Sequence, residues 1–183
     1  MALNEALSIR PQDEPTALLV SDAYLLVGAL DEAREALTPF VAAHKGMASP
    51  ALAALYGRLA RIAALAGDAK GELGALTRAL DADKKNGEIM GTLADRAEAA
   101  GDLDLALKAL RLIIANNAVG PVTVPDAFLR QARIAHRRGE QDRAVMFARR
   151  AAQEAPKGDP IQRAARELVT ALEGEQPTRK RRS

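Results

Sequence analysis

Residues 100–113 read AGDLDLALKALRLI, a glycine–aspartate turn followed by a segment whose apolar residues recur every three or four positions. Residues 66–80 read AGDAKGELGALTRAL, and the turn glycines of the two stretches, Gly67 and Gly101, are 34 residues apart. The short period indicates an amphipathic helix, and the fixed longer spacing indicates a structural repeat. This stretch therefore predicts that the chain is built from repeated helical hairpins.

The same turn occurs four times along the chain. The equivalent glycines are Gly28, Gly67, Gly101 and Gly139, with spacings of 39, 34 and 38 residues. Small residues lie seven positions before each glycine, at Ser21, Ala60, Ala94 and Ala132. Glycine permits the positive φ that ends a helix, and small side chains let two helices approach closely. One hairpin of two helices of about 12 residues cannot bury its apolar face alone, whereas stacked copies can.

This pattern resembles the tetratricopeptide repeat. The nearest copies are GTLADRAEAAGDLDLALKALRLI, residues 91–113, and AFLRQARIAHRRGEQDRAVMFARRAAQEAP, residues 127–156, which ends with the proline that the family expects. The pattern departs from the family at Glu72, where a small residue is usual, and at Gln131, where leucine is usual. The resemblance implies an all-α fold, a right-handed superhelical array of about four helix-turn-helix repeats. We expect these repeats near residues 14–47, 53–86, 87–120 and 125–158.

Two of the spacings exceed 34 residues, which predicts loops between the repeats concerned. Ser49 and Pro50 form a good helix start, with a capping side chain followed by proline in the first turn. Gly120, Pro121 and Pro125 predict a few non-helical residues before the fourth repeat.

The ends of the chain are expected to differ from the repeats. Residues 1–13 are either the end of a preceding repeat or a lone N-terminal capping helix, so the chain is either a piece of a longer array or begins with a cap. A helix over 159–173 has polar faces that suit the solvent-facing cap that repeat arrays require. Residues 174–183, which end in RKRRS, are expected to form a disordered basic tail.

Composition excludes several classes of function. The chain has no cysteine, and aromatic residues make up 3% of it, so a thiolate metal site is impossible and close-packed helices are favoured. His44 and His136 lie in different repeats, and no residue spacing suggests a catalytic, cofactor or metal site. We therefore expect a non-enzyme without cofactors. No apolar run could span a membrane and no signal peptide is evident, which favours a cytoplasmic location.

Charged residues gather on the first helices of the expected repeats. Arg130, Arg133 and Arg137 are spaced by three and four residues, so they share one face of a helix. The resemblance implies that first helices line a concave groove, acidic in its middle and basic toward its C-terminal end. A solvated face with an ion pair between Asp126 and Arg130, worth about 0.2–0.5 kcal/mol, is the other interpretation. The candidate groove residues are Arg61, Asp95, Glu98, Arg130, Arg133 and Arg137.

The resemblance implies a protein–protein interaction scaffold that binds a partner segment in this groove, and the basic end favours an acidic partner. Residues 1–125 carry 12 Lys or Arg and 16 Asp or Glu, whereas residues 126–183 carry 14 and 8. The alternative is therefore a nucleic-acid-binding helical repeat that uses the basic C-terminal third, although the groove lacks aromatic residues for base stacking.

One kind of partner is disfavoured. In chaperone-binding members of the family, lysine, asparagine and arginine hold the terminal carboxylate of a peptide. The corresponding places here are Leu18, Asp22, Arg58, Glu88 and Thr92 in one register, and a second register matches no better. The sequence therefore does not identify the partner, and it leaves the oligomeric state open.

Overall fold

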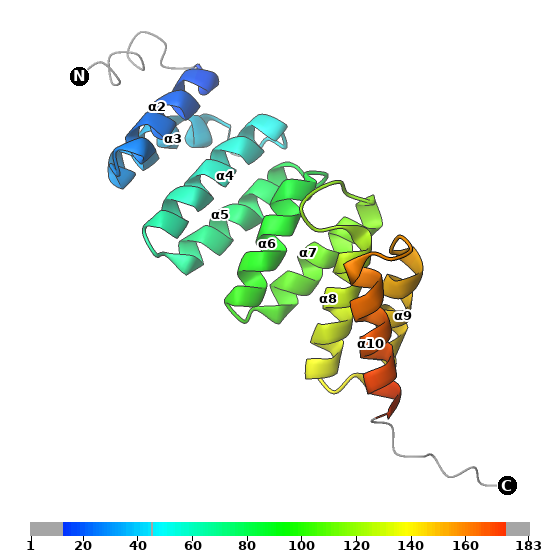
Figure 1. Cartoon of the computed structure of the whole chain (residues 1–183). Coiled ribbons are helices and arrows are strands. Elements are labelled where there is room, and N and C mark those ends of the chain that lie inside the picture. The colour runs from blue at the N-terminus through cyan, green and yellow to red at the C-terminus, as the bar shows by residue number, and fades with distance from the viewer. Residues whose placement is uncertain (1–12, 45, 175–183) are drawn as a thin grey trace, which may run out of the picture. The chain divides into compact units, whose positions relative to one another are not determined.

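The computed structural model describes residues 13–44 and 46–174 (Figure 1). Within these ranges all regular secondary structure is helical and no strand occurs, so the all-α prediction is confirmed. Contacts divide the chain into two compact units, Met1–Ile89 and Met90–Ser183, and each is described by itself.

The first unit contains two helical hairpins. Its helices are α2 (Glu14–Leu26), α3 (Leu30–Ala43), α4 (Pro50–Leu65) and α5 (Ala69–Ala82). Within each hairpin the two helices pack together, and α3 also packs against α4. The largest side chains of the core between them are Leu37, Phe40, Leu55 and Ile62, all of them buried. Apolar residues at three- and four-residue spacing therefore form one continuous core along these helices.

The second unit continues the pattern. Helix α6 (Gly87–Ala99) runs from the end of the first unit into the second, which also contains α7 (Leu103–Asn116), α8 (Val124–Arg137), α9 (Gln141–Glu154) and α10 (Pro160–Gly174). Helix α8 packs against α7 and α9, and α10 packs against α9 and α8 (Figure 1). The faces of α8 that carry Arg130, Arg133 and Arg137 are thereby held by a hairpin that is packed on both sides.

The turns between paired helices have the conformation expected of them. The four turn glycines have φ between 72° and 77°, which side chains with a Cβ rarely adopt. The acids that follow two of these glycines cap the next helix. Asp68 accepts a hydrogen bond from the amide of Gly71 at 2.8 Å, and Asp102 accepts one from the amide of Leu105 at 3.0 Å. These bonds satisfy amides that the first helical turn would leave without a partner.

Two helices begin with a capped proline. The Ser49 hydroxyl accepts a hydrogen bond from the amide of Leu52 at 3.1 Å, and Pro50 lies in the first turn of α4, as predicted. The prediction that the loop extends through Pro125 was wrong by two residues, because α8 begins at Val124. Proline is tolerated there because the first turn of a helix does not use its own N–H groups.

The connection between α7 and α8 folds onto α6. Val122 in this loop is buried, with 1% of its surface exposed. A Cβ built on Gly91 of α6 would lie 2.7 Å from Cγ of Pro121 and 3.3 Å from Cγ2 of Val122. The loop therefore lies directly against the α6 backbone and requires glycine at this place.

Replacing Gly91 by alanine should therefore destabilise the protein. The added methyl group must displace the Pro121 ring, which is rigid, and such overpacking typically costs about 1–3 kcal/mol, whereas alanine in a helix gains about 1 kcal/mol. We expect a net loss of about 1 kcal/mol in urea unfolding. Gly57→Ala in α4 is the matched control, because nothing lies within 4 Å of its Cβ position, and it should stabilise the protein. Equal stabilisation by both substitutions would contradict the contact at Gly91.

Helix α10 covers the end of the last hairpin. It spans Pro160–Gly174, close to the cap expected over 159–173 and one residue into the expected tail. Its buried residues Ala165 and Leu172 join apolar clusters with α8 and α9. The division into four repeats and a cap remains our proposal. The expectations for residues 1–12 and for the tail from 175 onward lie outside the described residues.

Candidate functional site

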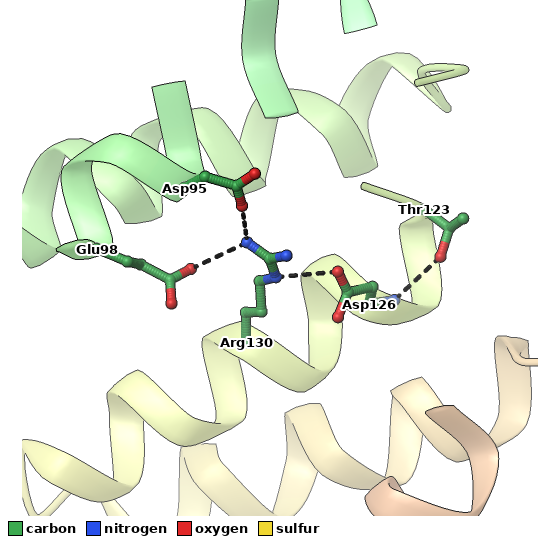
Figure 2. A network of polar contacts seen from close by, with 5 residues as sticks. All are labelled: Asp95, Glu98, Thr123, Asp126 and Arg130. Atoms are coloured by element: carbon green, nitrogen blue, oxygen red, sulfur yellow. Dashed lines mark hydrogen bonds and ion pairs between the residues drawn. The ribbon is translucent and has the colours of Figure 1, made fainter. Parts of the chain in front are cut away.

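Arg130 of α8 lies at the centre of a network of carboxylates (Figure 2). Its guanidinium donates a hydrogen bond to Asp95 of α6 and lies 3.6 Å from Glu98 of the same helix. Its Nε donates to Asp126, one turn earlier in α8, at 2.9 Å. The hydroxyl of Thr123 accepts a hydrogen bond from the Asp126 amide at 3.4 Å, which holds the start of α8. One cation thus joins two first helices.

The electrostatic surroundings keep Arg130 charged. Partial burial by itself would lower the pKa of the guanidinium, but the hydrogen bond to Asp95 and the charges of Asp126, Asp95 and Glu98 together raise it. The Arg130 side chain is 23% exposed, whereas that of Asp95 is 51% exposed. Three acids surround one base, so the network has an excess of negative charge that faces solvent at Asp95.

The first unit contains an equivalent ion pair. Arg58 of α4 donates to Asp22 of α2 at 2.9 Å. Asp22 and Asp95 each lie six residues before a turn glycine, and Arg58 and Arg130 each lie nine residues before the next turn glycine along. The same ion pair therefore connects first helices of successive hairpins in both units. Its signal was in the sequence as two matched places, but the partners are 36 and 35 residues apart and no local rule joins them.

The predicted site residues differ in what they contact. Asp95, Glu98 and Arg130 come together in the network, so Arg130 is not an open cation, and its pair with Asp126 is present as the solvated-face interpretation expected. Arg133 and Arg137 are exposed, and neither forms an ion pair or a side-chain hydrogen bond with any described residue. Arg61 lies in the first unit, also exposed and also without an ion pair in the described ranges. It occupies the repeat place that Asp95 and Arg133 occupy in later hairpins.

The described residues offer little for metal chemistry. No group of three His, Asp or Glu among them could hold a metal ion. The Nδ1 of His44 is 2.8 Å from the carbonyl oxygen of Phe40 in its own helix, and the Nδ1 of His136 is 3.3 Å from the Gln141 side chain. Both histidines thus make local contacts at helix ends. No helix in the described ranges has the length and apolar character needed to cross a membrane.

Comparison with known proteins places the fold. No family model matches this sequence, and no curated protein matches it significantly. Among solved structures, MamA is 19% identical with a TM-score of 0.59, over 94% of this chain and 88% of that one. A tetratricopeptide repeat protein from Parabacteroides merdae is 20% identical with a TM-score of 0.64, over 88% of this chain and 60% of that one.

A third solved structure carries the same type of repeat. It is a putative kinesin light chain from Podosopora anserina with nearly identical TPR-like repeats, 19% identical, with a TM-score of 0.54 over 87% of this chain and 85% of that one. At these identities the likeness concerns the fold. It confirms the repeat that the turn spacing predicted, and the chain has the fold of the tetratricopeptide repeat proteins.

Proposed function

We propose that this chain is a non-catalytic scaffold that binds a segment of another protein on the exposed face of its first helices. The observation that carries the proposal is the contrast along α8. Arg130 is held by three carboxylates, whereas Arg133 and Arg137, on the same face, are exposed and make no ion pair among the described residues. Two cations one helical turn apart favour a partner segment with acidic residues.

The network around Arg130 supports binding indirectly. It joins α6 to α8, so the helix that presents Arg133 and Arg137 is positioned before any partner arrives. A preformed surface loses little conformational freedom on binding, and less of the interaction energy is spent on ordering. Asp95 and Glu98 add a negative area beside the two arginines, which would reject a uniformly acidic partner and favour one with acidic residues only opposite α8.

Reversal of both free charges tests this proposal. Arg133→Glu with Arg137→Glu should leave the melting curve nearly unchanged, because exposed charges contribute little to stability. The affinity for the protein partner recovered by pull-down and mass spectrometry should fall at least tenfold, about 1.4 kcal/mol, since attraction becomes repulsion. The matched control is Lys108→Glu with Arg111→Glu, two exposed cations three residues apart on the second helix α7.

Two outcomes would contradict the proposal. If the partner binds the doubly reversed protein as tightly as the parent, the face of α8 is only a solvated surface. If the purified protein binds mixed-sequence RNA or DNA at physiological salt, with a salt dependence that falls when residues 179–182 are removed, the nucleic-acid alternative replaces the scaffold. Titrations at two salt concentrations distinguish these cases.

A further inference from the structure

The geometry points to a second docking site, on the outer side of α9, for a short amphipathic helix of a partner protein. A hollow of about 820 Å³ lies over this helix, bounded by one residue of α8 and one of α10. The residues that line it are Phe128, Asp142, Val145, Met146, Phe147, Arg149, Arg150, Gln153 and Glu173. This hollow lies wholly within the second unit and involves none of the proposed groove residues.

The floor of the hollow is apolar and partly exposed. The rings of Phe128 and Phe147 are stacked with their centroids 6.5 Å apart, and the Arg150 guanidinium lies 5.7 Å from the centre of the Phe128 ring. Met146 beside them is 54% exposed. Aromatic rings and methionine together make a soft apolar surface of the type that accepts apolar side chains of a partner.

These apolar residues are not a requirement of the repeat. Met146 lies seven residues after its turn glycine, where the other three hairpins have Glu35, Gly74 and Lys108. Phe147 lies eight residues after it, where the others all have alanine, at Ala36, Ala75 and Ala109. The second helix of the last hairpin thus departs from the others in the direction of greater exposed apolar surface, which marks interaction sites on soluble proteins.

The shape of the hollow fits a helix. Asp142, Met146, Arg149 and Gln153 recur every three or four residues, so they follow one face of α9 for about 16 Å, the length of three helical turns. A partner helix that lies along this face can place apolar residues at the same spacing over the Phe128, Phe147 and Met146 surface. An extended segment would place alternate side chains away from the floor and use less of it.

Charge selects the orientation of that helix. Arg149 is held by Glu173 at 2.6 Å and Arg150 by Glu154 at 3.0 Å. Asp142, at the start of α9, is exposed and has no ion pair within the described ranges. The unmatched charge of the hollow is therefore negative and lies at its α9 N-terminal end. A partner helix antiparallel to α9 places its last turn there, where basic residues also suit its own dipole.

The probe is a synthetic peptide of about 14 residues with leucines at three- and four-residue spacing, lysine in its last turn and a fluorescent label at its first. Fluorescence polarisation with the full chain should show saturable binding, and NMR amide shifts should map to α9. Met146→Glu should weaken this binding at least tenfold, while Val119→Glu, an exposed apolar residue in the same unit outside the hollow, should change it less than twofold.

A charge exchange tests the orientation. Asp142→Lys should weaken binding of the lysine peptide, and a peptide with glutamate in its last turn should recover it. The inference is overturned if the peptide does not saturate, if Met146→Glu and Val119→Glu act alike, or if the amide shifts map to Arg133 and Arg137. It is also overturned if sedimentation shows a dimer that Met146→Glu abolishes, since the occupant is then a second copy. A chain ending at Gly174 that binds the peptide tenfold more tightly would instead identify residues 175–183 as the occupant.

Discussion

A chain that ends at Gly158, and so lacks α10, is expected to aggregate or to self-associate and to lose several kcal/mol of stability. Leu172 and Ala165 of α10 are buried, and the apolar side chains they contact on the last hairpin include Leu129, Val145 and Ala151. Burial of one leucine contributes about 1.5–3 kcal/mol, and α10 also covers the alanines that bring α8 and α9 together. Removing the helix exposes a contiguous apolar surface, which repeat arrays normally cap.

The same truncation breaks polar contacts that hold α10 in place. The side chain of Gln141 donates to the carbonyl oxygen of Leu172 at 3.0 Å, and that of Gln162 donates to Ala152 at 3.3 Å. Sedimentation and a thermal melt measure the effect, with a chain ending at Gly174 as the control because it retains α10. A monomeric truncation that melts at the parent temperature would show that the last hairpin needs no cap.

Ala106→Leu is expected to cost about 2–3 kcal/mol, the upper part of the range for overpacking a close-packed interior. Ala106 lies on α7 five residues after its turn glycine, and it is fully buried together with Ala94 and Ala97 of α6. Leucine adds three carbon atoms where small side chains let the two helices approach. The strain can be relieved only by moving α7 away from α6, which also loosens Leu110 and Ile113 in the same helix.

Ala115→Leu is the matched control for this prediction, because Ala115 lies on the same helix but is exposed. Alanine and leucine have similar helix propensities, so the control should stay within about 0.5 kcal/mol of the parent. Urea unfolding measures both variants. A melt of Ala106→Leu that matches the parent would contradict the proposed repeat register, since that register places the alanine at the closest approach of the hairpin.

The local features of the fold could be predicted from the sequence because they depend on neighbouring residues. Glycine at the end of a helix, aspartate one residue later and proline in a first turn each act within four residues. The structure has all three, at Gly101, Asp102 and Pro50 among other places. The error at Pro125 has the same origin, because proline both ends a loop and begins a helix, and only the packed helix decides between the two.

The candidate site could be predicted only in part. The spacing of Arg130, Arg133 and Arg137 determined that they share a face, and the spacing of Asp126 and Arg130 determined that they can pair. The sequence did not show that Asp95 and Glu98 would also engage Arg130. That contact joins residues 35 apart, and it depends on how far α8 is shifted along α6.

The sequence by itself thus determined the hairpins, their turns, their small-residue contacts and the faces on which charges gather, since helix periodicity and capping act over a few residues. Only the tertiary structure decided which arginines remain free, why Gly91 must stay small beneath Pro121, and where Phe128 and Phe147 form an apolar hollow with Glu173. Each of these depends on the distance and shift between packed helices. Those are set by the whole core rather than by any one stretch of chain.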